Sequence, residues 1–188
     1  MNHVKDYLEE TKQIADTIRV TDIERIVDEI VSLKARFGRL YIAGLGGSAA
    51  NASHATNDFR KLCGIDAHCL TDNVASVTAR ANDLGWEKCL ELDYAGERDA
   101  LLVLSVGGGS EGVSVPLVMA AINITKLGGT LLGIVGRDGG IIGKIAKASV
   151  IVPTVSELRV TPHTEGWQSV VLHCLVSHPR LQVSPTKW

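Results

Sequence analysis

The sequence predicts an α/β fold, a three-layer sandwich in which helices cover both faces of a mainly parallel, five-stranded sheet. Short apolar segments alternate with helical segments in units of about 30 residues, as in parallel strands joined by helical crossovers. The clearest strand segments are almost continuously apolar, which is typical of strands buried on both faces. Of the 188 residues, 45% are hydrophobic but only 4% are aromatic. The core is therefore expected to consist mainly of leucine, isoleucine, valine and alanine.

We expect residues 1–188 to form one domain, because this length suits a single hydrophobic core. Residues 1–36 read as two amphipathic helices, and Thr21-Asp22 offers an N-cap for the second. These helices precede the first strand, so they do not connect two strands of the sheet. We expect them to pack on another subunit or to flank the edge of the sheet. Residues 179–188 are expected to form a C-terminal tail.

Apolar runs, glycines and prolines define the other elements. Residues 100–106 are the clearest strand, and Pro116 suits the first turn of a helix over 114–127 that Gly128-Gly129 ends. Strands are expected at 40–43, 64–70, 100–106, 130–135 and 149–152. Helices are expected after the first strand and at 74–81, 114–127, 141–147 and 161–177, with a loop at 82–86 and a short helical piece at 89–94.

Composition and charge exclude several classes of function. The net charge is −2 and the sequence has no basic run, which argues against a nucleic-acid partner. No apolar segment reaches the roughly 18 residues of a membrane span, and the N-terminus lacks the apolar core of a signal peptide. We therefore expect a soluble, cytoplasmic protein. Without C-x-x-C spacing, reduced thiols are expected rather than disulfides at the four cysteines. These are Cys63, Cys69, Cys89 and Cys174.

Two glycine-serine turns follow predicted strands. Gly44–Ser48 comes after the first strand, and Gly107–Ser110 follows the strand over 100–106. One such turn is most simply turn chemistry, but two at the same edge of a parallel sheet favour an anion cradle. The hydroxyls of Ser48, Ser105 and Ser110, with backbone N–H groups, suit a phosphate monoester. Neither turn has the pattern of a dinucleotide-binding turn or a P-loop.

Two pairs of polar residues lie on two predicted helices. His54 and Asp58 are four residues apart and share a helix face, whereas Glu165 and His173 are eight apart and also point to one side. His54 and Asp58 alone read as a surface pair, and His173 alone reads as a core histidine. Together the four have the composition of a Zn²⁺ site or of an acid–base pair. Spacing leaves both interpretations open.

The order and spacing of these motifs resemble the sugar isomerase (SIS) domain family, and within it the phosphoheptose isomerases. The resemblance covers nearly the whole chain. Gly44–Ser48 stands for the family's Gly-Asn-Gly-Gly-Ser, and Ser105–Ser110 for its Ser-Thr-Ser-Gly-Asn-Ser. Asn82–Gly85 stands for Asn-Asp-Phe-Gly, and Gly136–Gly140 matches a further turn. The last helix matches the family's glutamine followed eight residues later by histidine.

The resemblance implies roles for particular residues. Asp58 falls on the family's catalytic glutamate and His173 on its catalytic histidine, and Glu165 is a candidate to share the role of base. His54, Asp58, Glu165 and His173 match positions that bind zinc in some members. Substrate and phosphate binding is implied for Gly46, Gly47, Ser48, Asn82, Asp83, Ser105, Gly107, Gly108 and Ser110.

The implied activity is an aldose–ketose isomerisation of sedoheptulose 7-phosphate to a heptose 7-phosphate through an enediol. The implied cofactor is a divalent metal, expected to be zinc, and the implied assembly is a homotetramer with active sites between subunits. Two alternatives stay open: a non-catalytic sugar-phosphate sensor or scaffold, and an isomerase of another ketose phosphate.

Several residues depart from the family pattern and indicate a divergent subgroup. Asp58 is one methylene shorter than the family's glutamate, and Glu165 adds a negative charge where the family has glutamine. The charge added by Glu165 makes the predicted ligand set more strongly cation-binding, whereas the shorter Asp58 means that its carboxylate must be reached differently. Hydroxyl and amide groups are lost in the two turns, so backbone amides are expected to carry more of the anion binding. The positions concerned are Leu45, Val106, Gly107 and Gly109.

Overall fold

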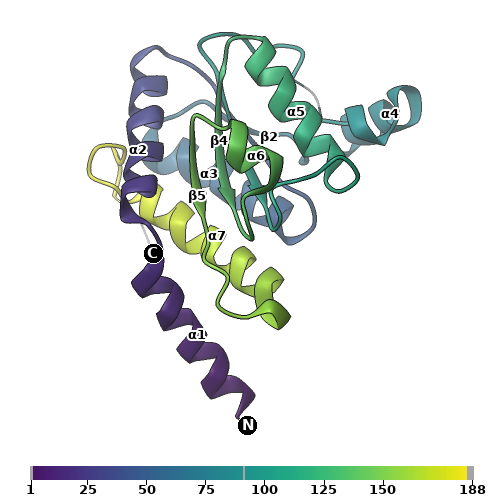
Figure 1. Ribbon diagram of the computed structural model, residues 1–188. Helices are drawn as coiled ribbons and strands as arrows, with labels where there is room; N and C mark the ends of the chain where they lie inside the picture. The colour runs from purple at the N-terminus through teal and green to yellow at the C-terminus, as the bar shows by residue number, and fades with distance from the viewer. Residues whose placement is uncertain (1, 91, 186–188) are drawn as a thin grey trace.

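The computed structural model describes residues 2–90 and 92–185. A central sheet lies between two layers of helices (Figure 1). The strands are β1 (Leu40–Ala43), β2 (Ala67–Cys69), β3 (Ala100–Ser105), β4 (Thr130–Val135) and β5 (Ala148–Ile151). The helices are α1 (His3–Thr17), α2 (Val20–Ala35), α3 (Gly47–Cys63), α4 (Val74–Leu84), α5 (Val115–Lys126), α6 (Gly140–Ile145) and α7 (Val160–Val176). Short 3₁₀ turns occur at η1 (Trp86–Lys88) and η2 (Glu157–Arg159).

The five strands are all parallel and lie in the order β2-β1-β3-β4-β5. This confirms the predicted fold class. The chain leaves β1 to form β2 on one side and then returns to place β3 on the other side. The crossovers therefore diverge between β1 and β3, where open parallel sheets bind ligands at the carboxyl ends of their strands. Both predicted glycine-serine turns leave the sheet at this point.

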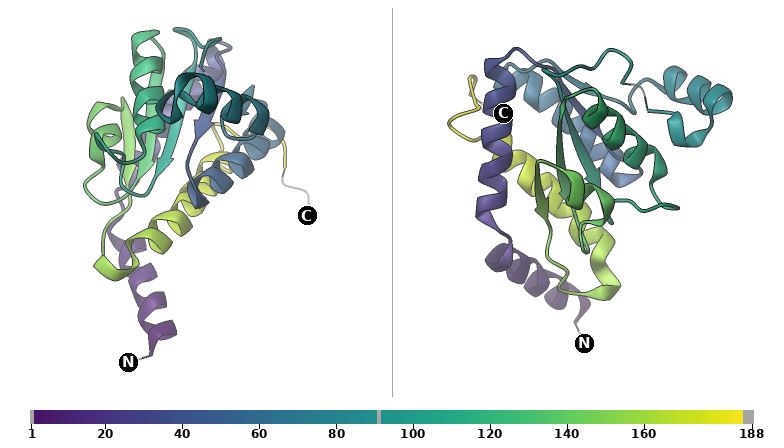
Figure 2. Two further views of the ribbon diagram at one scale, coloured as in Figure 1. Left: turned by 90° about the vertical axis from the view of Figure 1, so that its right-hand side faces the viewer. Right: turned by 45° about the horizontal axis from the view of Figure 1, so that its top comes forward.

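Alternating side chains of the three central strands, β1, β3 and β4, enter two separate cores. Leu40 and Ile42 of β1 join the core under α2, α3 and α7, whereas Tyr41 and Ala43 join the core under α5 and α6. Figure 2 shows these helices on opposite faces of the sheet. Burial on both faces explains why the strands are continuously apolar.

Some predicted boundaries were wrong. The second helix begins at Val20 with Arg19 as its N-cap, so Thr21 and Asp22 lie inside its first turn. Residues 82–84 belong to α4 rather than to a loop. The predicted second strand shrinks to three residues, and the helical piece expected at 89–94 is replaced by η1 just before it. Residue 91 lies outside the described residues.

The two N-terminal helices behave differently. α2 packs against the edge strand β5. This is the second of the two arrangements expected, in which the helix flanks the edge of the sheet. α1 extends away from the sheet, with Val4 and Leu8 exposed (Figure 1). Glu10 of α1 pairs with Arg159 and His163 at the start of α7. Hydrogen bonds from Arg159 and then His163 lower the pKa of Glu10 to about 2.

The described part of the C-terminal tail folds back on the end of α3. The N–H of Val183 donates to the carbonyl of Leu62 at 2.8 Å, and Leu181 is buried. Residues 186–188 of the predicted tail lie outside the described residues. Over residues 2–90 and 92–185, the helices are too short or too polar to cross a membrane.

Candidate active site

Ser48 and Ser105 meet at the carboxyl ends of β1 and β3. Both are buried, at 1% and 4% exposure, and both line a pocket of about 230 Å³ that we call the inner pocket. Its other lining residues are Leu45, Leu104, Val106, Gly107, Val113, Ser114, Leu117 and Arg137. The two predicted turns therefore come together at one place, as expected from the sheet topology.

The turn after β3 is held tightly against the turn after β4. The N–H of Gly108 donates to Oγ of Ser105 at 3.2 Å, and the N–H of Ile142 donates to the carbonyl of Gly108 at 2.9 Å. Gly108 has a φ of +68°, and a Cβ built on it would lie 1.8 Å from the carbonyl oxygen of Gly139. A side chain here would collide with backbone, so glycine is required for this close approach.

Ser110 lies on an adjoining pocket of about 450 Å³, the outer pocket. The two pockets adjoin, because both are lined by Gly107, Val113, Ser114 and Arg137. The predicted set of three serines is thus divided. Two hydroxyls are buried together, and that of Ser110 stands on the exposed side.

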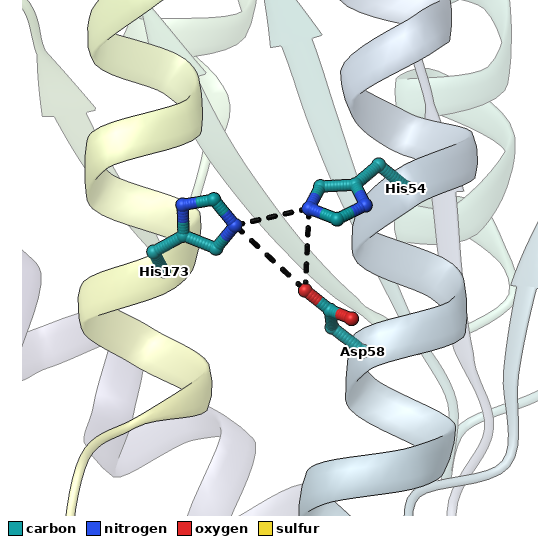
Figure 3. A group of neighbouring side chains, drawn as sticks. All are labelled: His54, Asp58 and His173. Atoms are coloured by element: carbon teal, nitrogen blue, oxygen red, sulfur yellow. Dashed lines mark hydrogen bonds and ion pairs between the residues drawn. The ribbon is translucent and has the colours of Figure 1, made fainter. Parts of the chain in front are cut away.

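A second group of polar side chains joins α3 to α7 (Figure 3). Nε2 of His54 lies 2.9 Å from Nε2 of His173 and 3.3 Å from Oδ2 of Asp58. Nε2 of His173 lies 3.8 Å from the same carboxylate oxygen. Because the two ring nitrogens are in hydrogen-bond contact, one of them must be an unprotonated acceptor. The side chains of His54 and His173 are about half exposed, at 51% and 58%.

The three donor atoms of His54, Asp58 and His173 have the chemistry and spacing of a metal site. They all lie within 4.8 Å of one another. Ligands at about 2.0–2.2 Å from a tetrahedral Zn²⁺ lie about 3.4 Å apart, which is close to the separations observed here. Two histidines and one carboxylate are also a donor set of catalytic zinc sites, which keep a fourth position for substrate or water. The residues present therefore fit a zinc ion.

Glu165, the fourth predicted ligand, lies elsewhere. A Cβ built on Gly47 would lie 2.5 Å from Oε2 of Glu165, so this carboxylate stands beside the first turn of α3. Eight residues of helix span about 12 Å, which separates Glu165 from His173 even though both face α3. Glycine at position 47 leaves the room that the carboxylate occupies.

Asn51 is a polar contact that the sequence reasoning missed. Its Nδ2 donates to the backbone carbonyl of Glu165 at 2.9 Å and to Oε1 of Gln168 at 3.1 Å. Oγ of Ser169 donates to Oδ1 of Asn51 at 2.8 Å. These bonds hold α3 and α7 side by side. Spacing was the available signal, because steps of four, three and four residues place one side chain after another on a helix face. That face carries Gly47, Asn51, His54 and Asp58.

Five predicted substrate-binding residues line neither pocket, namely Gly46, Gly47, Asn82, Asp83 and Gly108. Asn82 and Asp83 stand in the last turn of α4, exposed, where Nδ2 of Asn82 donates to Oδ1 of Asp83 at 2.8 Å. Arg137, by contrast, was given no substrate-binding role in the sequence analysis, yet it lines both pockets.

Comparison with known proteins finds both similar sequences and similar structures. No protein-family model matches the sequence. The phosphoheptose isomerase of Trichlorobacter lovleyi is 31% identical over 146 residues, which cover 73% of this chain and 70% of that protein. That of Sulfurimonas denitrificans is 29% identical over 171 residues, covering 84% and 86%. The structure of phosphoheptose isomerase GmhA from Neisseria gonorrhoeae superposes with a TM-score of 0.79 at 23% identity, covering 93% of this chain and 95% of that one.

Proposed function

Because the chain belongs to the phosphoheptose isomerase family, we propose that it converts sedoheptulose 7-phosphate to a heptose 7-phosphate through an enediol. One observation carries this proposal. A single helix, α3, begins at the buried Ser48 and carries His54 and Asp58 farther along the same helix. With a rise of about 1.5 Å per residue, Ser48 and His54 are about 9 Å apart along the axis. An extended sugar phosphate fits this arrangement with its phosphate at Ser48 and its carbonyl end at the histidines.

The phosphate end of the substrate would be held by the inner pocket. Ser48 and Ser105 offer hydroxyl donors there, and the turn glycines Gly46, Gly47 and Gly107 have no side chain that would cover their backbone N–H groups. The N–H of Gly108 already donates to Oγ of Ser105, so Gly108 would shape the turn. Fixing the remote end of the sugar brings its first two carbons to the other end of the site, which lowers the entropic part of the barrier. Ser110 would contact the phosphate from the outer pocket.

The proton transfers would be shared by His173, Asp58 and Glu165. A base takes a proton from C1 of the ketose while an acid protonates the oxygen on C2, which gives the enediol. A proton is then delivered to C2 and the hydroxyl proton on O1 is removed, which gives the aldose. Glu165 stands outside the group formed by His54, Asp58 and His173, so its carboxylate is free to exchange protons with the sugar when those three are engaged.

We also propose that His54, Asp58 and His173 hold a divalent metal, expected to be zinc. When bound, the ion would polarise the carbonyl and hydroxyl oxygens of the sugar. The half-exposed imidazoles leave the site open to substrate, while the Asn51 contacts fix the distance between the two helices that carry the ligands.

A homotetramer with active sites between subunits is part of the same proposal. α4 buries none of its residues and carries Asn82 and Asp83, so a neighbouring chain would bring these side chains into use. Val4 and Leu8 on α1 are exposed apolar residues that suit contact with another subunit. Light scattering tests the assembly through the mass in solution. The single-domain organisation and the cytoplasmic location remain predictions.

A panel of ketose phosphates tests the activity. The purified protein is incubated in D₂O with sedoheptulose 7-phosphate, fructose 6-phosphate or ribulose 5-phosphate, with added Zn²⁺ or with a chelator, and followed by NMR. We expect the aldose only from the seven-carbon sugar, with deuterium at C2, because protonation of the enediol draws on solvent. The chelator should suppress turnover. Thermal stabilisation by these ligands without turnover would instead identify a sensor.

A further inference from the structure

Arg137 occupies a place in the site that none of the roles above uses. It is the second residue after the end of β4, and its side chain lies across the turn after β3. A Cβ built on Gly107 would lie 3.5 Å from Cδ of Arg137 and 3.9 Å from its Nε. Arg137 lines the inner and the outer pocket alike. Its guanidinium therefore borders the place where the buried serines Ser48 and Ser105 meet.

The charge of Arg137 has no partner within the part of the chain that the structure describes, where no hydrogen bond or ion pair involves its guanidinium. The neighbouring carboxylate is engaged elsewhere, since Oδ1 of Asp138 accepts the N–H of Gly140 at 3.1 Å. Asp138 and Lys144 line the outer pocket but not the inner one. Among the described residues that line the inner pocket, Arg137 is thus the one that carries a charge.

The backbone at Arg137 is strained. Its φ is 53°, in the left-handed region that disfavours side chains with a Cβ. Three described residues other than glycine have a positive φ, namely Phe37, Ser114 and Arg137. Two of these three, Ser114 and Arg137, line the inner pocket together. Strain of this kind collects at ligand-binding sites, because a gain in binding offsets its cost.

A phosphate dianion in the inner pocket would otherwise meet only neutral groups. The remaining lining consists of hydroxyls, glycine backbone and apolar walls such as Leu45 and Val113. Hydrogen bonds from a charged donor are about twice as strong as neutral ones, and a guanidinium can contact two phosphate oxygens at once. The unpaired Arg137 at this rim supplies the positive charge that the rest of the pocket lining lacks.

We propose that Arg137 binds the phosphate group of the substrate and supplies the positive charge of the inner pocket. The identity of the sugar rests on the function proposed above, whereas the contact with phosphate does not. Inorganic phosphate alone therefore tests the inference.

The test compares Arg137→Gln and Arg137→Lys with a matched control, Arg98→Gln. Arg98 is exposed just before β3, at the opposite edge of the sheet, so its variant makes the same chemical change and has the same net charge as Arg137→Gln. Calorimetric titration with inorganic phosphate at fixed ionic strength gives the affinity. Arg137→Gln should weaken binding about 10- to 100-fold, the loss expected for a charged hydrogen bond. Arg137→Lys should lose less, because it keeps a point charge, and Arg98→Gln should match the wild type.

Equal phosphate affinity in Arg137→Gln and Arg98→Gln would overturn the inference, as would a wild-type protein that binds no phosphate. Melting curves verify that all variants are folded. With sedoheptulose 7-phosphate, Arg137→Gln should raise KM more than it lowers kcat, since the contact exists before and during the reaction. Arg137-dependent phosphate binding without turnover of any ketose phosphate would refute the proposed function and leave this inference standing. Normal turnover with unchanged phosphate affinity in Arg137→Gln would refute this inference and leave the proposed function standing.

Discussion

We call the amino-terminal ends of the strands the amino edge of the sheet and their carboxyl-terminal ends the carboxyl edge. Charged residues at the two are paired to very different extents. At the amino edge, Asp99 is 4% exposed and fully paired. It accepts the backbone N–H of Arg39 at 2.8 Å, the Arg39 guanidinium at 2.9 Å and the N–H of Gly96 at 2.9 Å. Burial raises the pKa of Asp99, but the hydrogen bonds from Arg39 and Gly96 outweigh it and leave this pKa below its usual value.

At the carboxyl edge, charged and titratable groups are left partly exposed. Arg137 has no described partner, and the imidazoles of His54 and His173 are about half exposed beside Asp58. The backbone is strained at Ser114 and Arg137. Groups that are satisfied within the chain contribute to stability, whereas unsatisfied groups are available to a ligand. The amino edge therefore holds the fold together, and the unsatisfied groups at the carboxyl edge support the proposal that the substrate binds there.

The largest effect is expected for His173→Ala and Asp58→Ala. Each should lower kcat for sedoheptulose 7-phosphate about 10²- to 10⁴-fold, because each removes a group that moves protons or fixes the sugar oxygens. Thermal stability should change little in His173→Ala, since the His173 side chain is about half exposed, and more in Asp58→Ala, since the Asp58 side chain is 15% exposed. Steady-state kinetics and melting curves give both quantities.

A histidine on the same side of the fold gives the control for that experiment. His178, just past the end of α7, pairs weakly with Glu24 at 3.6 Å and lies outside the site. His178→Ala should keep the wild-type kcat. Near-normal turnover in both His173→Ala and Asp58→Ala would show that neither residue takes part in the reaction.

The next effect is on stability and belongs to the amino edge. Asp99→Asn should destabilise the protein by about 2–3 kcal/mol, because it leaves Arg39 without its charged acceptor. The figure is below that of a fully buried pair, since the Arg39 side chain is 36% exposed. Urea unfolding measures the loss. Asp93→Asn, which breaks the more exposed pair with Arg80, should cost less than about 1 kcal/mol, and equal losses would remove the contrast between the two pairs.

Comparison of Asp99→Asn with the wild type also tests how stability depends on pH. The pKa of Asp99 is lower in the folded protein than in the unfolded chain. Its ionisation therefore stabilises the fold above the unfolded pKa of about 4 and ceases to do so as pH falls through the lower folded value. The difference between wild type and Asp99→Asn should be constant near pH 7 and shrink below about pH 4. A difference that grows on acidification would contradict this assignment.

The smallest expected effect is a gain in stability at the carboxyl edge, in contrast to the loss expected for Asp99→Asn. Arg137→Gly should stabilise the phosphate-free protein by about 0.5–1 kcal/mol, because relief of the left-handed backbone exceeds the extra entropy of glycine in the unfolded chain. The same variant should bind phosphate as poorly as Arg137→Gln. Urea unfolding in phosphate-free buffer checks the sign, and a loss of stability would mean that the Arg137 side chain serves the fold.

The sequence was most informative where one residue type dominates a segment. The strand at 130–135 was placed to the residue because its apolar run is bounded by Gly129 and Gly136. The end of α4 was missed, because Asn82-Asp83 has the composition of a turn while the backbone stays helical to Leu84. Local composition decides such cases weakly, and the continuing helix overrides it.

Within the candidate site, helical periodicity predicted which way the side chains of α7 point but not how far apart they reach α3. Glu165 and His173 do face the same helix, yet they reach α3 at points that lie two turns apart. Arg137 carried no signal, since a single arginine in a glycine turn has no spacing to read. Its position becomes informative only when β3 and β4 lie side by side and bring the two turns together.

Helix α3 also limits how this protein can change over evolution. Ser48 and His54 are joined by a rigid helix whose rise per residue is fixed, so substitutions can alter either end without altering the span between them. Inserting one residue between them would turn the later side chains by about 100° and misdirect them. With the function proposed above, adaptation to a shorter or longer sugar would therefore come from the turn after β3 or from movement of α7, because α3 fixes the spacing between Ser48 and His54.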